Sequence, residues 1–176
     1  MTTVIRKVRA TLTIHPDHVE KRFHNPDNAA HEHDWYQRIP WACPRLLDRP
    51  DPATLILARH PPAGPGYRPA QALADLLHEL ERLGIAHRDV HPGNIVAGPQ
   101  GPLLIDWETG LSTPGKPSYD IHGPEISGVP VPDIHRAIRS RNSPNGYCMY
   151  WRSPHPASIQ NQWGVDFPGR VGGSGG

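Results

Sequence analysis

Two short stretches carry most of the information in this chain: His87-Arg88-Asp89-Val90-His91-Pro92-Gly93-Asn94 and Leu103-Leu104-Ile105-Asp106-Trp107-Glu108. Between them lie the apolar Ile95-Val96-Ala97 and the turn-forming Gly98-Pro99-Gln100-Gly101. Apolar runs on either side of such a turn predict a short hairpin. Its adjacent ends would bring together the carboxylates of Asp89 and Asp106 and the amide of Asn94.

Both stretches resemble the active site of the protein-kinase-like superfamily. The first fits the pattern H-R-D-x-x-x-x-N, and Asp106-Trp107-Glu108 takes the place of D-F-G. The resemblance implies that Asp89 accepts the proton of the attacking hydroxyl and that Asn94 and Asp106 hold magnesium ions. The length of the match and of the intervening hairpin argue against coincidence.

The last residues of the first stretch indicate which branch of the superfamily the chain resembles. Protein kinases that modify Ser, Thr or Tyr usually have Lys two residues after the catalytic Asp, whereas this chain has His91 followed by Pro92-Gly93-Asn94. That ending is similar to aminoglycoside kinases, choline kinases and the bacterial Kdo/heptose lipopolysaccharide kinases. Glu108, in place of the Gly of D-F-G, favours the same small-molecule branch. Arg88 does not, since many of those kinases have Gly there.

Length and composition limit the size of the fold. A chain of 176 residues forms one domain, but a two-lobed kinase is normally longer. The 22 Pro and 17 Gly predict that much of the chain is extended or looped, since Pro is present at more than twice its usual share. We therefore expect a pared-down α+β fold.

Charge and cysteine content exclude several classes of protein. A net charge of +1 with scattered Lys and Arg predicts no general attraction to nucleic acid or membranes. Cys43 and Cys148 belong to no C-x-x-C pair, so neither a zinc ribbon nor a disulfide framework is predicted. No apolar run approaches about eighteen residues, and no signal-peptide core follows Met1. We expect a cytoplasmic protein without a membrane span.

The N-terminal segment predicts two strands, Val8–Ile14 and Val19–Phe23, joined by a turn at His15–His18. Lys21 falls on the apolar face of the second strand. In the family that the chain resembles, a strand lysine contacts the nucleotide phosphates, which implies this role for Lys21. The alternative is a lysine that snorkels from a small edge strand.

A helix is predicted from Pro26 to Arg38, because Asn25 suits the N-cap and Pro the first helical position. Glu32 lies on the same semi-apolar stripe as Ala29 and Tyr36, so we expect it to pair with Lys21.

A competing interpretation makes a metal site of His31-Glu32-His33-Asp34 with His15, His18 and His24. Histidines two residues apart point to different sides of a helix, and the H-E-x-x-H spacing is absent. The pairing with Lys21 is therefore favoured.

The middle of the chain predicts a strand at Thr54–Ala58, a linker at 59–64 whose backbone would meet the adenine, and a long helix from Pro69. Gly84 stops this helix, whose apolar face consists of Leu73, Leu76, Leu77, Leu80 and Leu83. His87 is expected to pack beneath the loop that carries Asp89, without taking part in proton transfer.

Two departures from the family pattern stand out. The first glycine is Gly64, so no glycine-rich loop precedes Lys21, and we expect the flap over the triphosphate to be absent or replaced by the His15–His18 turn.

After Gly110 the chain shows no long amphipathic period. Asp120 is expected to be buried against the catalytic loop, the alternative being a Pro-rich loop with incidental polar groups. Aromatic residues are expected to pack this last segment on the core: Tyr147, Tyr150, Trp151 and Trp163.

The sequence thus predicts one kinase-like α+β domain over residues 1–171, with a truncated N-lobe (1–58), a hinge (59–64), a reduced C-lobe (65–171) and a flexible tail (172–176). ATP and Mg²⁺ would bind between the lobes, and the γ-phosphoryl would pass to a hydroxyl of a small molecule, a sugar, a lipid or a protein. The expected site consists of Lys21, Glu32, Asp89, Asn94 and Asp106. The alternative is a pseudokinase that binds a protein partner through the Trp- and Pro-rich C-terminal segment.

Overall fold

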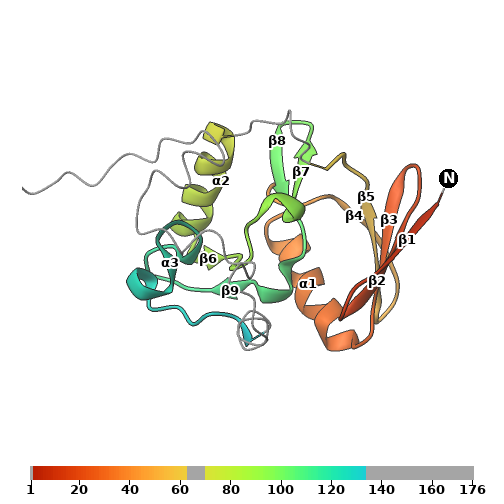
Figure 1. The fold of residues 1–176 in the computed structure, drawn as a ribbon, viewed down its shortest axis with the longest axis horizontal. Helices are drawn as coiled ribbons and strands as arrows, with labels where there is room; N and C mark the ends of the chain where they lie inside the picture. The colour runs from red at the N-terminus through yellow and green to blue at the C-terminus, as the bar shows by residue number, and fades with distance from the viewer. Residues whose placement is uncertain (1, 63–69, 134–176) are drawn as a thin grey trace, which may run out of the picture.

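The computed structural model describes residues 2–62 and 70–133. Its N-terminal part is a five-stranded antiparallel sheet with strand order β1-β2-β3-β5-β4 (Figure 1). The strands are β1 (Thr3–Arg6), β2 (Ala10–Ile14), β3 (His18–Phe23), β4 (Leu46–Asp51) and β5 (Thr54–Ala58). Strand β3 has neighbours on both sides, so Lys21 lies in the middle of the sheet and not on an edge strand.

Helix α1 (Pro26–Arg38) follows β3 directly and spans the predicted range. Asn25 caps it by accepting a 2.9 Å hydrogen bond from the backbone N–H of Asp27. Its buried residues are Ala29, Glu32, Trp35 and Tyr36. The predicted stripe is therefore confirmed, and it carries Glu32 into the interior.

The second part of the described chain contains α2 (Ala70–Arg82), β6 (Ile85–Ala86), η1 (Pro92–Asn94), β7 (Ile95–Gly98), β8 (Gly101–Leu104), η2 (Trp107–Thr109), β9 (Leu111–Ser112) and α3 (Tyr119–Ser127). Figure 1 shows α2 and α3 at the end of the molecule away from the five-stranded sheet, with the β7–β8 hairpin between. This is a mixed α/β arrangement, with three α-helices among the described residues.

Helix α2 confirms most of the predicted leucine face. Leu73, Leu76, Leu77 and Leu80 are buried. Leu83 was expected with them, but it follows the end of the helix and is 39% exposed. Gly84 has φ +64°, and a Cβ there would lie 2.7 Å from Cα of Pro114, so only glycine fits this stop.

The predicted hairpin forms as β7 and β8, with Ile95 opposite Leu104 and Gly98 opposite Gly101. Just beyond its paired end, the backbone N–H of Ile105 donates a 3.0 Å hydrogen bond to the carbonyl oxygen of Asn94. The hairpin therefore sets Asn94 beside the residue that precedes Asp106.

The N-terminal prediction was wrong in one respect. Val8 does not belong to a strand: Lys7, Val8 and Arg9 form the turn between β1 and β2, and the N–H of Lys7 donates to the carbonyl of Ala10 at 2.8 Å. Val8 is 87% exposed at its tip. The alternating pattern continued through this turn, which concealed both the turn and strand β1.

Residues 59–62 tie the sheet to the hairpin. The N–H of Arg59 donates to the carbonyl of Asp17, and the N–H of Ala97 donates to the carbonyl of Pro61. Val96 forms an isolated bridge with Pro62. The rest of the expected hinge, the aromatic cluster after residue 146 and the glycine-rich tail lie outside the described residues.

Helix α3 was not predicted as a helix. Ser118 caps it by accepting from the N–H groups of Asp120 and Ile121. Gly123, at φ 83° and ψ 176°, interrupts the helical backbone just before Pro124. Within residues 2–62 and 70–133, no helix has the length and apolar character to span a membrane.

Candidate active site

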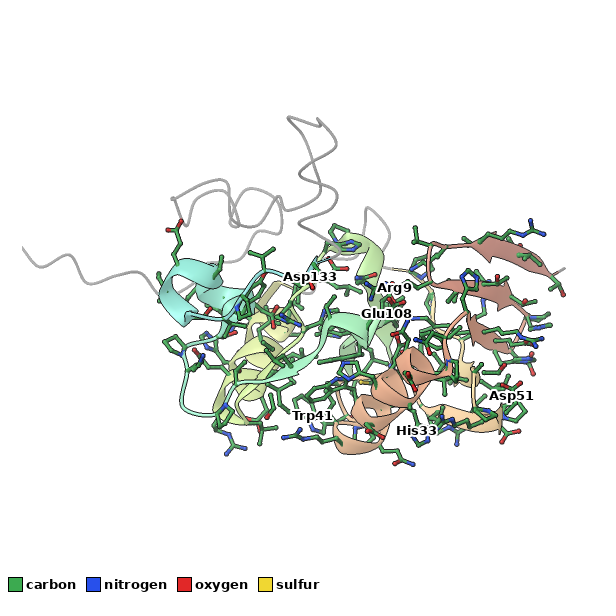
Figure 2. All side chains as sticks on the ribbon, turned by 90° about the horizontal axis from the view of Figure 1, so that it is seen from below. Arg9, His33, Trp41, Asp51, Glu108 and Asp133 are labelled. Atoms are coloured by element: carbon green, nitrogen blue, oxygen red, sulfur yellow. The ribbon has the colours of Figure 1, made fainter. Side chains whose placement is uncertain are left out.

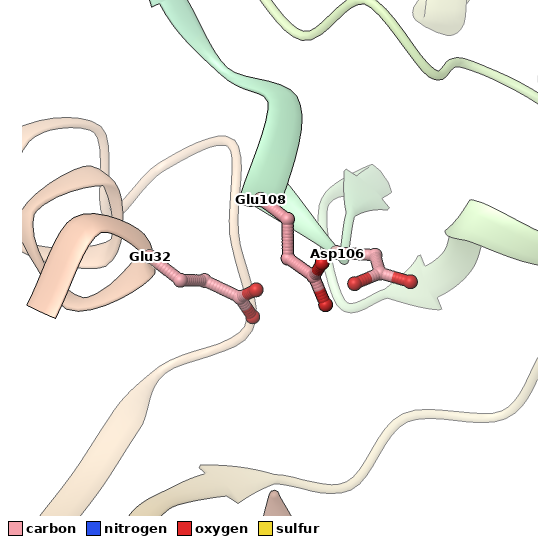
Figure 3. A group of neighbouring side chains, drawn as sticks. All are labelled: Glu32, Asp106 and Glu108. Carbon is pink, nitrogen blue, oxygen red and sulfur yellow. The ribbon is translucent and has the colours of Figure 1, made fainter. Parts of the chain in front are cut away.

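Lys21 is the centre of a buried charge cluster. Its Nζ lies 2.7 Å from Oε2 of Glu32, 2.7 Å from Oδ1 of Asp106 and 3.7 Å from Oε1 of Glu108. The Lys21 side chain is 4% exposed and that of Glu32 is fully buried. The predicted pairing of Lys21 with Glu32 is confirmed. Figure 3 shows the three carboxylates turned toward one another, Glu32 from α1 and the other two from the segment after β8.

For the side chains of this cluster, burial and the neighbouring charges shift the pKa in opposite directions. Burial would lower the pKa of Lys21, but the three carboxylates raise it above its ordinary value. Burial raises the pKa of Glu32 to about 7, against the attraction of the Lys21 ammonium. Burial would also raise the pKa of Asp106, but Lys21 and Lys7 hold it well below its ordinary value. Asp106 is thus the carboxylate of the cluster that most strongly favours its ionised form.

The backbone around Asp106 is fixed by its neighbour. Trp107 is fully buried, and its Nε1 donates to the carbonyl of Leu104 at 3.0 Å. Asp106 itself has φ +69°; with Arg88, at φ +66°, it is one of the two described non-glycine residues with positive φ. Such conformations are costly and persist where the surroundings impose them, and here both fall in the candidate site.

Asp89 and Asn94 are brought together by η1. The Asn94 side-chain nitrogen donates to the Asp89 carbonyl and to Asp89 Oδ2, both at 3.0 Å. Nε2 of His91 lies 3.7 Å from the same Oδ2. The Asp89 side chain remains 24% exposed, so its carboxylate is oriented by Asn94 and still reachable from solvent.

Asp120 anchors the start of the loop formed by residues 87–94. Its carboxylate accepts from the backbone N–H of His87 at 2.6 Å and from that of Arg88 at 2.7 Å. The expected contact of Asp120 with this loop is therefore confirmed, and it explains how the positive φ of Arg88 is maintained. The guanidinium of Arg88 donates to the carbonyls of Thr109 and Pro130, away from the charge cluster.

His87 is structural, as predicted. Its ring is fully buried against Trp107, with ring centroids 4.4 Å apart. Nδ1 accepts from the N–H of Asp89 and Nε2 lies 3.0 Å from the carbonyl of Ile105, which assigns the proton to Nε2. Burial lowers the pKa of His87 to about 4, so the ring is neutral at pH 7.

Three contacts escaped sequence reasoning. Nζ of Lys7 lies 2.7 Å from Oδ2 of Asp106, an Arg9 guanidinium nitrogen lies 3.5 Å from Oε2 of Glu108, and Glu108 itself joins the cluster. The flap was expected to be absent or replaced by the His15–His18 turn. That turn lies at the end of β2 away from Lys7 and Arg9, where it is hydrogen-bonded to Arg59. Had the turn between β1 and β2 been recognised from the sequence, its cationic residues Lys7 and Arg9 would have indicated these contacts.

The competing histidine-rich metal site does not form in the described part of the chain. The group of side chains there whose ligand atoms converge is Glu32, Asp106 and Glu108, all within 4.8 Å of one another, and no histidine joins it.

An open cavity of about 480 Å³, including its mouth, adjoins the cluster. Its charged end contains Lys7, Lys21, Glu32 and Asp106, and its other walls include apolar side chains from both parts of the fold, namely Leu12, Val19, Leu57, Val96 and Ile105.

One comparison with known proteins assigns the chain to a family. A search of curated proteins found no match. The family model of the phosphotransferase enzyme family (APH) matches residues 17–123, which is more than half of the chain and includes the five predicted site residues as well as Glu108 and Asp120. With a match of this extent, the chain belongs to the phosphotransferase enzyme family, within the protein-kinase-like superfamily that also includes the aminoglycoside and choline kinases.

Proposed function

We propose that this protein is an ATP- and magnesium-dependent phosphotransferase that moves the γ-phosphoryl group to a hydroxyl acceptor. One observation carries the proposal: Lys21 lies 2.7 Å from both Glu32 and Asp106, although Asp106 is 85 residues away from it in the sequence. A lysine held between a helix glutamate and a metal-binding aspartate is the arrangement on which kinase catalysis depends.

Asn94 and Asp106 are the residues that would hold the metal. Magnesium prefers oxygen ligands and often uses one or two carboxylates together with phosphate oxygens. Asp106 supplies a carboxylate biased strongly toward ionisation. Asn94 directs its amide nitrogen to Asp89, which leaves its amide oxygen as the ligand. The donor set therefore fits magnesium, which would neutralise charge on the transferred phosphoryl group.

Lys21 would bind the nucleotide phosphates. Its own position depends on Glu32, which is buried and held in place on α1. Because Lys21 is 4% exposed, its charge acts in a medium that screens it weakly, so it contributes more than a surface lysine would. The apolar walls of the cavity, among them Leu12, Val96 and Ile105, suit an adenine ring.

Asp89 would accept the proton of the acceptor hydroxyl. Its Oδ2 is oriented by the Asn94 amide, and its partly exposed carboxylate is accessible to an acceptor. His87 is neutral and engaged with backbone groups through both ring nitrogens, so it supports the loop and leaves the proton to Asp89.

The proposal is tested with γ-labelled ATP and magnesium on panels of amino sugars, amino alcohols, lipids and proteins, together with basal ATP hydrolysis. Wild type should transfer label to one class of hydroxyl, and Asp89→Asn should reduce the rate by about a hundred- to ten-thousand-fold. Asp34→Asn is the matched control, because its carboxylate is 81% exposed on α1. Wild type that binds ATP without transfer or hydrolysis would instead favour the pseudokinase alternative.

A further inference from the structure

The turn between β1 and β2 is poorly suited to bind nucleotide phosphates through its backbone, as a glycine-rich flap does. Its residues are Lys7, Val8 and Arg9, and none is glycine. Phosphates approach a backbone closely where glycine leaves room. In this turn, contact with an anion must come from side chains.

Both cationic side chains of the turn point at the candidate site. Lys7 binds Oδ2 of Asp106 at 2.7 Å and also lines the cavity. Nη1 of Arg9 lies 3.5 Å from Oε2 of Glu108, and both residues are labelled in Figure 2. The Arg9–Glu108 pair ties the turn to the cluster, and the partly exposed Lys7 lines the cavity beside it.

Asp106 has an ammonium group on each of its oxygens, Lys21 on Oδ1 and Lys7 on Oδ2. A metal ion on this carboxylate would repel both ammonium groups, so its binding would favour release of the more weakly held one. Lys21 has two further carboxylates within 3.7 Å and is 4% exposed, whereas Lys7 is 38% exposed and has Asp106 as its one ion-pair partner among the described residues. Lys7 is therefore the more weakly held of the two ammonium groups.

We propose that Lys7 transfers from Asp106 to the phosphates of the bound nucleotide and so performs, with a side chain, the clamping that a glycine-rich loop performs with its backbone. This inference rests on the proposed function. Once displaced from Asp106, the Lys7 ammonium would be available to phosphate oxygens bound beside that carboxylate. Lys7 lies outside the stretch matched by the family model, residues 17–123, so the match assigns it no role.

The test compares dissociation constants for magnesium–ATP and for adenosine by isothermal titration calorimetry. Lys7→Met should weaken magnesium–ATP binding about ten- to a hundredfold, the range for a hydrogen bond to a charged group, and leave adenosine binding unchanged. Lys7→Arg should keep most of the affinity. Lys116→Met is the matched control, since Lys116 is exposed in a turn of the other part of the fold.

The outcomes separate this inference from the proposed function. An unchanged or tighter magnesium–ATP affinity in Lys7→Met would overturn the inference alone, and tighter binding would mean that Lys7 merely blocks Asp106. Equal weakening of adenosine and magnesium–ATP would also overturn it, because the defect would then not lie at the phosphates. Wild type that fails to bind magnesium–ATP would overturn the proposed function itself.

Discussion

Replacing Lys21 by Met should destabilise the protein strongly at pH 8. Met keeps the length and apolar stem of the side chain but removes its charge. Glu32, Asp106 and Glu108 would then face one another within 4.8 Å without the buried ammonium between them. Breaking a buried ion pair by removing one partner typically costs about 3–5 kcal/mol. We expect a loss in this range, because Glu32 is fully buried and its other oxygen, Oε1, has no hydrogen bond.

The assay is urea unfolding at pH 8 and at pH 5.5, followed by tryptophan fluorescence, to which the buried Trp35 and Trp107 contribute. Burial raises the pKa of Glu32 to about 7 from its ordinary 4.5, so the folded state takes up a proton before the unfolded state does. Protonation of Glu32 therefore favours folding as the pH falls from 7 toward 4.5. Lys21 opposes this effect, so the gain on acidification should be larger in Lys21→Met than in wild type.

Glu32→Gln and the double variant complete a thermodynamic cycle. The double variant should be less destabilised than the sum of the single variants, since Gln removes the charge that Lys21→Met leaves uncompensated. A loss below about 1 kcal/mol for Lys21→Met at pH 8, typical of exposed pairs, together with additive single variants, would refute the description of this cluster as a desolvated ion network.

Three further predictions concern the supports of the site. Asp120→Ala removes the acceptor of the His87 and Arg88 N–H groups and should cost about 2–4 kcal/mol of unfolding free energy in urea; an unchanged midpoint would contradict this. Gly110→Ala would put a Cβ 2.6 Å from Nε1 of Trp35, so thermal denaturation should reveal a loss of about 1–3 kcal/mol. Burial lowers the pKa of His87 from 6.5 to about 4, so the unfolded state is protonated first and stability is lost as the pH falls from 6.5 to 4. His87→Asn should lack this component of about 3 kcal/mol, and identical pH profiles for variant and wild type would count against it.

The residues with local sequence signals were predicted well. Asn25 and Pro26 defined the start of α1, the Gly/Pro turn defined the β7–β8 hairpin, and the period of β3 singled out Lys21. Glu32 followed because its helical stripe was semi-apolar. These predictions succeeded because cap, turn and strand patterns involve neighbours in the chain.

The features that were not predicted either depend on contacts between segments far apart in the chain or have a misleading local pattern. Lys7 meets Asp106 across 99 residues, and nothing in the local pattern distinguishes its turn from a continuing strand. Strand β4 contains Pro50, which weakens a strand prediction, and it pairs with β5 through register shifts. Helix α3 was concealed by Gly123 and Pro124, which interrupt its helical backbone. The position of Asp120 was nevertheless predicted, because that prediction required only burial beside the loop that carries Asp89. It did not require that α3 be recognised as a helix.

The most direct test of the central claim is the affinity for ATP in the presence of magnesium, measured by calorimetry for wild type, Asp106→Asn and the exposed control Asp34→Asn, with folding checked by circular dichroism. A neutral amide cannot replace the carboxylate that would hold the metal on the phosphates. Wild type and Asp34→Asn should therefore bind ATP alike, and Asp106→Asn should lose most of the affinity that depends on magnesium. Equal magnesium-dependent affinity in wild type and folded Asp106→Asn would contradict the account.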